Sequence, residues 1–109
     1  MAEPRLHEEI SPRLQDLLVE HGVRSRQPAG TQLFAVGEES DSVYIVEDGL
    51  LRVDRTTPSG KQVLVTLVAP GDVVGELSLI DGGRRSASCS VVRSTRVLKL
   101  GEKDFLRIL

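Results

Sequence analysis

Residues 75–85 place a glycine, a carboxylate and an arginine within one short span of the chain. Gly75 and Glu76 fall where a strand is expected to give way to a short helix, and the free backbone N–H groups at a helix start attract anions. Arg85 adds a guanidinium, whose two-pronged donors match the oxygens of a phosphate. A carboxylate beside a phosphate would repel it unless the carboxylate bound another group, such as a sugar hydroxyl. These residue types at this spacing predict a site for a small phosphorylated sugar.

Two runs in this part of the chain have the order of a known motif: glycine-glutamate-leucine-serine-leucine at residues 75–79 and arginine-serine-alanine at residues 85–87. Together they closely resemble the phosphate-binding cassette of cyclic nucleotide-binding domains. The second run is most similar to the bacterial catabolite activator protein family, and the regulatory subunits of cAMP-dependent protein kinase share the cassette. The resemblance extends roughly from Pro28 to Leu109. Further matches in the family's order are Gly37-Glu38, Asp48-Gly49 and Pro70-Gly71-Asp72.

The resemblance implies a role for each residue of the cassette. Glu76 would accept a hydrogen bond from the ribose 2′-hydroxyl, and Arg85 would pair with the cyclic phosphate. Ser78 would donate its backbone N–H to the phosphate, and Ser86 would donate both its N–H and its hydroxyl. The small side chain of Ala87 would leave space beside the phosphate. The implied ligand-binding set is Gly75, Glu76, Leu77, Ser78, Arg85, Ser86 and Ala87.

Competing structural interpretations exist for several of these residues. Val65 and Val68 occupy positions that lie near the base in the resembling family, but simple core packing is the favoured explanation for both valines. Glu76 could instead be a helix-start carboxylate favoured by the helix dipole. Arg85 could be a surface arginine in a polar loop, although its place in the cassette favours the phosphate. Its neighbour Arg84 is expected to face solvent, because neighbours along a strand point to opposite sides.

The residue at position 86 bears on which nucleotide would bind. Family members that select guanine often carry threonine where this chain has Ser86, whereas a serine resembles the bacterial cAMP-binding pattern. Ser86 still carries a hydroxyl, which leaves cGMP open as the alternative ligand. The resemblance therefore implies cAMP, or else cGMP, as the ligand and no separate cofactor.

The composition argues against nucleic-acid binding and against catalysis. The formal net charge is −2 with both signs spread along the chain, so no basic block is present to contact nucleic-acid phosphates. Both histidines, His7 and His21, precede the region of expected strands. The strands therefore lack the imidazoles that metal-dependent cupins use as ligands. A catalytic serine–histidine–aspartate relay would need a histidine from the leading helix. We expect no enzyme activity, no metal and no nucleic-acid partner.

Cysteine content and hydropathy indicate where the chain resides. Cys89 is the only cysteine, so an internal disulfide is impossible. The residues after Met1 are polar and charged, unlike a signal peptide, and no apolar run approaches membrane-spanning length. We expect a soluble, cytoplasmic chain without a membrane partner.

The pattern of apolar residues predicts a mainly β fold. Short runs rich in valine and leucine alternate with turn residues after Gly22, and Asp48-Gly49 has the form of a tight hairpin turn. This spacing is typical of a β jelly roll, or double-stranded β-helix barrel, here with flanking N- and C-terminal helices. Strands are expected at residues 33–36, 43–46, 50–55, 62–68, 86–93 and 96–100. The leading helix presents one face made of Leu14, Leu17, Leu18 and His21.

At 109 residues the chain is expected to form one domain. Residues 1–22 would be an N-terminal helical segment, residues 23–100 the β-roll, and residues 101–109 the start of a C-terminal helix. Catabolite activator relatives continue past this point with a long helix, which forms the dimer seam, and then with a DNA-binding winged helix-turn-helix. The resemblance therefore implies that an effector domain or a second copy would be engaged through the C-terminal helix region.

Two functions of different classes fit these observations. The first is a regulatory module that senses cAMP and has no output domain of its own. The second is a protein-interaction module of the same fold with a vestigial pocket. Glu76 and Arg85 are both intact, which favours the sensor because a vestigial pocket has no need of them.

Overall fold

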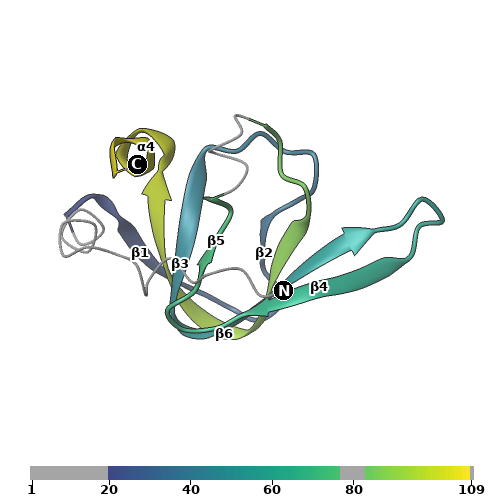
Figure 1. The fold of residues 1–109 in the computed structure, drawn as a ribbon. Coiled ribbons are helices and arrows are strands. Elements are labelled where there is room, and N and C mark those ends of the chain that lie inside the picture. Colours follow the sequence, from purple (N-terminus) through teal and green to yellow (C-terminus); the bar gives the residue numbers. More distant parts are fainter. Residues whose placement is uncertain (1–19, 77–82, 109) are drawn as a thin grey trace.

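The computed structural model describes residues 20–76 and 83–108 (Figure 1). These residues form mainly antiparallel β structure followed by a short C-terminal helix, which confirms the predicted fold class. Most of the predicted N-terminal helix lies outside the described residues, and His21 near its predicted end is helical. The elements in chain order are β1 (Val23–Gln27), β2 (Gln32–Phe34), β3 (Ser42–Thr56), β4 (Gln62–Val68), β5 (Val73–Val74), β6 (Ser88–Gly101) and α4 (Glu102–Ile108).

The two longest strands, β3 and β6, form the centre of the sheet. They pair in antiparallel fashion from Ser42 opposite Gly101 to Asp54 opposite Ser88, with shifts of register near the middle of β3. β1 adds to the outer side of β6 and β4 to the outer side of β3, while the short strands β2 and β5 pair with β6 and β3 respectively. Figure 1 shows both long strands curving around the bottom of the view, so the sheet rolls up instead of lying flat.

The hairpin predicted at Asp48-Gly49 is wrong. The chain passes through both residues within the single strand β3, and both halves of that strand pair with β6. The real hairpin joins β3 to β4 through a turn in which the Gly60 N–H donates to the Thr57 carbonyl at 2.8 Å. The two strands predicted over residues 86–100 are likewise one continuous strand, β6. Two long bent strands therefore replace four short ones.

Close packing against β6 explains why Gly49 bends β3 without reversing it. Gly49 has a positive φ of 107°, and a Cβ there would lie 2.6 Å from Thr95 Cα and 2.7 Å from the Ser94 carbonyl oxygen. Thr95 is completely buried, and its Oγ1 accepts a hydrogen bond from the Leu50 N–H at 2.9 Å. The same hydroxyl lies 2.6 Å from the carbonyl oxygen of Arg93. The two central strands thus cross at backbone contact, which only a glycine permits, and they bend together.

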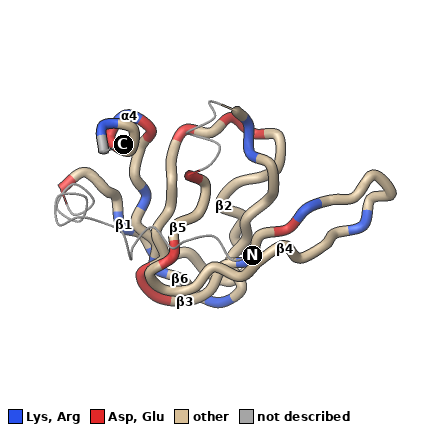
Figure 2. Tube along the Cα trace, viewed as in Figure 1, with Lys and Arg blue, Asp and Glu red and all other residues tan. Residues whose placement is uncertain are grey.

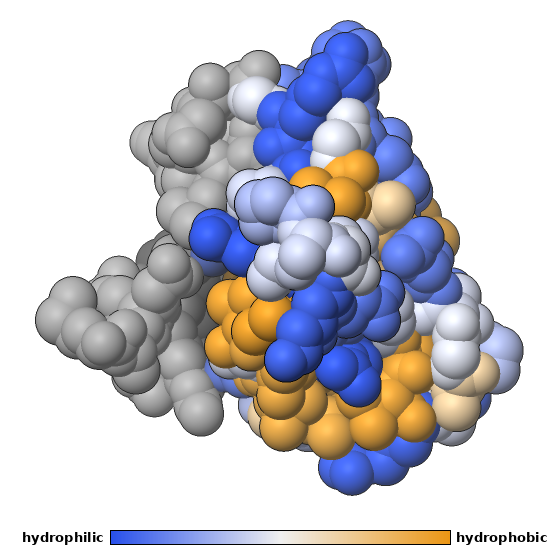
Figure 3. All heavy atoms as spheres, turned by 90° about the vertical axis from the view of Figure 1, so that its right-hand side faces the viewer, coloured by the Kyte–Doolittle hydropathy of each residue, from blue (hydrophilic) through white to orange (hydrophobic). Residues whose placement is uncertain are grey.

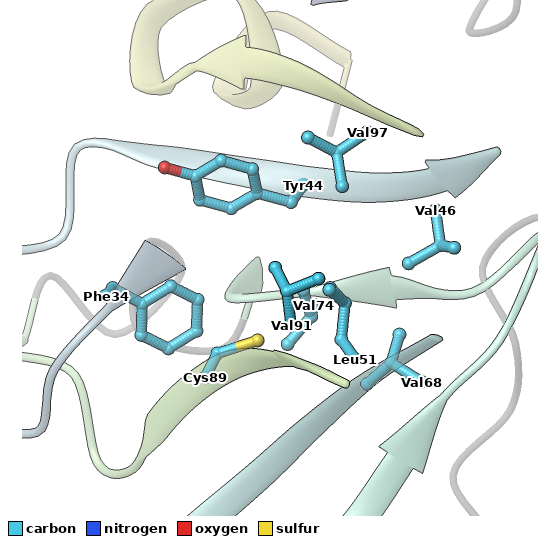
Figure 4. Close-up of a cluster of buried hydrophobic side chains, with 9 residues drawn as sticks. All are labelled: Phe34, Tyr44, Val46, Leu51, Val68, Val74, Cys89, Val91 and Val97. Atoms are coloured by element: carbon cyan, nitrogen blue, oxygen red, sulfur yellow. The ribbon is translucent and has the colours of Figure 1, made fainter. Parts of the chain in front are cut away.

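Apolar side chains from most of the strands meet in one main cluster, shown in Figure 4. Its members are Phe34, Tyr44, Val46, Leu51, Val68, Val74, Cys89, Val91 and Val97. A second cluster seats α4 on the central strands, because Phe105 of the helix is buried against Val43, Leu98 and Leu100. The helix is therefore anchored to β3 and β6 through one aromatic ring.

A network of ion pairs links β1, β3 and β6 near the bend of β3, where Figure 2 shows acidic and basic segments close together. Arg24 grips Glu47 with two donors, Nε to Oε1 at 2.6 Å and Nη2 to Oε2 at 2.9 Å. Arg96 Nε lies 3.5 Å from Oε1 of the same carboxylate. The hydrogen bond from Arg24 holds the pKa of Glu47 below its usual range, although partial burial acts in the opposite direction.

Strand β4 is unusual because apolar side chains project into solvent along most of its length. Val63, Leu64, Val65 and Leu67 are 43–50% exposed, and only Val68 at the end of the strand is buried. Figure 3 looks onto the side of the molecule on which β4 lies and shows apolar surface interrupted by polar residues.

Candidate functional site

Arg85 lies at the centre of the candidate site and is buried. Only 3% of this residue is exposed, in the segment that leads into β6. Its Nη2 donates to the carbonyl oxygen of Ser42 at 2.7 Å, and its Nη1 donates to the carbonyl oxygen of Gly75 at 3.1 Å. The guanidinium therefore joins the first residue of β3 to the residue that follows β5. A surface position in a polar loop, the competing interpretation from the sequence, does not describe this arginine.

The backbone of Arg85 is fixed as firmly as its side chain. Its N–H donates to the Glu38 carbonyl at 2.8 Å, and its carbonyl accepts from the Gly37 N–H at 2.8 Å. A further bond closes the same loop, because the Ser88 hydroxyl accepts from the Val36 N–H at 3.0 Å. The loop after β2 thus holds the segment before β6 in place and sets the direction in which the arginine enters the interior.

Gly75 provides the space that the guanidinium occupies. Its φ is +92°, and a Cβ at this position would overlap Arg85 Nη1 and lie 3.4 Å from Arg85 Cζ. A residue with a side chain would be strained at this φ and would have to displace the guanidinium, so the position requires glycine. β5, which carries Val73 and Val74, pairs with β3 through Ile45 opposite Val73 and delivers Gly75 to this point.

One nitrogen of the arginine is buried without a bond. Among the described residues, Arg85 Nε has no hydrogen-bond partner although it is inaccessible to solvent. The face of the guanidinium lies over the ring of Phe34, with Cζ 4.1 Å from the ring centroid. A buried N–H on a cation carries a high desolvation cost, and a negatively charged acceptor compensates for it best. The arrangement can therefore bind an anion.

Arg84 differs from its neighbour in the predicted way. Its side chain is exposed, donates to the Gly37 carbonyl at 3.0 Å and lies 3.8 Å from the carboxylate of Glu39. The two adjacent arginines point in opposite directions, so only Arg85 enters the interior.

The remaining predicted site residues differ in exposure, and two of them are not described by the structure. Glu76 follows Gly75, is half-buried and is itself helical. Ser86, the residue after Arg85, is exposed, and Ala87, the next residue, is buried. Leu77 and Ser78 lie outside the described residues, so their predicted roles stay predictions.

The two residues predicted to contact the base differ in burial. Val68 belongs to the main apolar cluster, as the core-packing interpretation predicts. Val65 is 50% exposed and lies at a shift of register, where Val53 pairs with Thr66 and Asp54 with Leu64. Of the two valines, Val65 is thus the one available to contact another molecule.

Two residues that hold the arginine were missed by the sequence reasoning. Phe34 contributes the ring beneath the guanidinium, and Ser42 contributes a backbone carbonyl rather than its side chain. The only indication in the sequence was the position of Phe34 three residues before the Gly37-Glu38 pair.

Cys89 lies close to this site, but its thiol is unreactive. It is fully buried and pairs with Phe34 across β2 and β6. Burial raises the pKa of its thiol to about 12, against the opposing effect of the Arg85 cation and with a smaller contribution from Asp54. A thiol in this state is a packing group, because the reactive form of cysteine is the thiolate.

Residues 20–76 and 83–108 contain no group of three or more histidine, cysteine, aspartate or glutamate side chains placed to hold a metal ion. In the same part of the chain no helix has the length and hydropathy needed to cross a bilayer.

A family model for the cyclic nucleotide-binding domain matches residues 24–109. The chain belongs to this family. The match covers every strand except the first residue of β1, and it includes Gly75, Glu76 and Arg85. The resemblance inferred from the cassette is therefore confirmed for the domain as a whole.

Individual members of the cyclic nucleotide-binding family share its sequence and fold. The cyclic AMP receptor protein of Thermus thermophilus is 34% identical over 100 residues, which are 92% of this chain and 46% of that protein. The crystal structure of the Thermus thermophilus catabolite activator protein matches with a TM-score of 0.83 and 34% identity, over 94% of this chain and 48% of that chain. The regulatory domain of Toxoplasma gondii PKA, crystallised with cAMP, matches with a TM-score of 0.86 and 25% identity, over 94% and 39% respectively. The domain therefore spans less than half the length of these relatives.

Proposed function

We propose that this cyclic nucleotide-binding domain is a regulatory module whose ligand is cAMP, with cGMP as the alternative. The observation that carries the proposal is the buried guanidinium of Arg85, whose Nε lacks a partner among the described residues. The phosphate of a cyclic nucleotide is a monoanion with two free oxygens, and it supplies the charge and the acceptor that this cation requires. The similarity to a PKA regulatory domain crystallised with cAMP supports the same ligand.

The residues around Arg85 complete the proposed site. Glu76 would accept from the ribose 2′-hydroxyl; it is half-buried and directly follows Gly75, whose carbonyl accepts from Arg85 Nη1. Ser86 would donate its hydroxyl and N–H to the phosphate, while the short Ala87 keeps that side open. Leu77 and Ser78 retain their assignment to the ligand-binding set, since both follow Glu76 directly.

Contact with the base would come from β4. The exposed side chain of Val65 supports this role. Val68 remains in the proposed set, but its burial in the main cluster supports a contribution through packing.

We further propose that residues 1–109 act as one domain, with the β-roll at residues 23–100, and that it regulates a partner instead of catalysing a reaction. Its output would pass through α4 to an effector domain or a second copy. The Glu102 N–H at the start of α4 donates to the Asp41 carbonyl at 2.9 Å, and the next residue, Ser42, accepts the bond from Arg85. The helix and the arginine are thus attached to adjacent peptide groups.

Titration with cAMP tests the proposal, with Arg85→Leu and Arg84→Leu as matched variants. A ligand that binds only the native state adds about 2.7 kcal/mol at roughly 100 times its dissociation constant. Each kcal/mol shifts the melting temperature of a domain of this size by about 4–8 °C. The wild type and Arg84→Leu should show this shift in millimolar cAMP, whereas 5′-AMP should produce little.

Arg85→Leu should lose most of the shift, because removal of one partner of a desolvated charge pair costs about 2–5 kcal/mol. If that variant does not fold, Arg85→Lys keeps the charge without the guanidinium fork and should also bind weakly. Equal responses of the variants at positions 84 and 85 would contradict the assigned site, and no shift in the wild type would contradict cAMP binding.

The exposed apolar residues of β4 favour one second candidate, a protein-interaction module with a vestigial pocket. Absence of any response to cAMP and cGMP in calorimetry, from a chain shown to be folded, would support that function instead.

A further inference from the structure

The ring of Phe34 forms one wall of the space that holds Arg85. Phe34 is the last residue of β2 and is 7% exposed, and its ring centroid lies 4.1 Å from Arg85 Cζ. The negative face of an aromatic ring attracts a cation, and the attraction is strongest where water is excluded. Arg85 is itself 3% exposed, so this contact is desolvated on both sides.

Neighbouring groups fix the orientation of the ring. Phe34 stacks against Tyr44 with centroids 6.1 Å apart and ring planes inclined by 27° (Figure 4). Phe34 also pairs with Cys89 across the sheet. The ring therefore cannot turn away without disturbing β2, β3 and β6 together.

The backbone places the ring and the guanidinium together. The residues just after Phe34 bind the backbone of Arg85 on both sides, through the Gly37 N–H and the Glu38 carbonyl, each at 2.8 Å. The strand end that carries the ring is thus tied to the segment that carries the cation, and the contact between them is built into the fold.

We propose that Phe34 is a positioning residue for ligand binding, and this rests on the cyclic nucleotide function proposed above. The ring holds the guanidinium plane while Nη1 and Nη2 donate to the carbonyls of Gly75 and Ser42. In this arrangement the Nε–H of Arg85, which has no partner within the described part of the chain, is one donor available to the phosphate. An aliphatic side chain would fill part of the same volume but would offer no aromatic face to hold the plane of the cation.

The experiment compares cAMP affinity by calorimetry in the wild type, Phe34→Leu, Phe34→Tyr and Val97→Ala. Phe34→Leu should bind about 5- to 30-fold more weakly, the range of a desolvated cation–π contact. Phe34→Tyr keeps an aromatic face and should restore affinity close to the wild type. Val97→Ala is the matched control, since Val97 belongs to the same buried cluster and is 1% exposed. It should lower the melting temperature without changing the affinity of the folded protein.

A second measurement follows Arg85 directly. In the ligand-free protein the Nε–H proton resonance of Arg85 should carry a ring-current shift, which Phe34→Leu removes and Val97→Ala keeps. Should Phe34→Leu fail to fold, Phe34→Met serves as the aliphatic variant, with the same expected losses.

The outcomes separate the two proposals. If the wild type binds cAMP and both Phe34→Leu and Phe34→Tyr bind it with the same affinity as the wild type, the positioning role alone is overturned. A parallel loss of affinity in Val97→Ala would overturn it too, because general loosening of the core would then explain the effect. No binding by the folded wild type would overturn the proposed function and the positioning role together.

Discussion

The guanidinium of Arg85 passes through the space in which residue 75 would otherwise carry a side chain. Nη1 donates to the Gly75 carbonyl at 3.1 Å, and a Cβ on Gly75 would overlap that same nitrogen. The glycine and the arginine of the cassette, ten positions apart, are therefore a single steric unit.

Gly75→Ala should consequently weaken both folding and ligand binding. Alanine at a φ of +92° costs about 1–3 kcal/mol, and the overlap with Arg85 adds to this cost. We expect a lower melting temperature and a lower urea concentration at the unfolding midpoint. The loss of cAMP affinity should be comparable with that of Arg85→Lys. Gly60→Ala is a suitable control, because Gly60 has a φ of +87° but no atom within 4 Å of its Cβ position. An alanine at position 75 that binds cAMP normally would contradict the steric coupling.

Glu76→Gln should weaken cAMP binding while scarcely affecting an analogue that lacks the 2′-hydroxyl. A carboxylate accepts a stronger hydrogen bond than an amide oxygen. The substitution should therefore lower the affinity only for the ligand that donates a hydrogen bond to residue 76. Calorimetry with cAMP and 2′-deoxy-cAMP on the wild type and the variant provides the four affinities required. Equal weakening for both ligands would show that Glu76 shapes the helix start.

Thr95→Val should destabilise the fold without touching the ligand site. The substitution keeps the side-chain volume but removes the acceptor for the Leu50 N–H and the donor for a backbone carbonyl, in a residue that is 0% exposed. Leaving a buried backbone group unpaired costs about 1–3 kcal/mol. Equilibrium unfolding in urea should show this loss, and the affinity for cAMP measured on the folded fraction should be unchanged. A change in affinity would mean that the bend at Gly49 and Thr95 communicates with Arg85.

Stability should depend on Glu47 in neutral solution and lose that dependence in acid. The folded state lowers the pKa of Glu47, so the stabilisation is present above the unfolded value of about 4.3 and disappears as the pH falls through the lower folded value. Glu47→Gln should therefore be less stable than the wild type at pH 7, and the two proteins should converge below about pH 4. Arg24→Gln should show most of the same loss, because Arg24 is the main cause of the lowered pKa. A difference that is constant with pH would contradict the ion-pair explanation.

The cassette could be predicted from the sequence because its order of residue types is specific and local. β4 was also predicted, because it is a compact run of β-branched and leucine residues bounded by turn residues, and the strand expected just before Gly75 is β5. β1 was not predicted. Four of its five residues are charged or polar and the fifth, Val23, is exposed, so its conformation depends on pairing with β6, as in Arg26 opposite Arg96.

The hairpin error and the missed aromatic contact have a common physical origin. Asp48-Gly49 has the local chemistry of a turn, but the packing of Thr95 against Gly49, from a strand more than forty residues away, turns it into a bend. The contact between Phe34 and Arg85 also joins distant segments, and no periodicity within either segment encodes it. Local patterns identified the candidate binding residues, whereas pairing between distant strands decided their surroundings.

The exposed outer strand β4 also affects how these molecules behave toward one another at high concentration. Its seven residues, Gln62–Val68, contain no charge, proline or glycine, and it ends the strand order in the described sheet. An unprotected edge of this composition is a template for β pairing between chains. Lys61 precedes the strand and is the nearest charge in the sequence on that side. Aggregation from concentrated solution would therefore begin at β4, on the same strand that carries Val65.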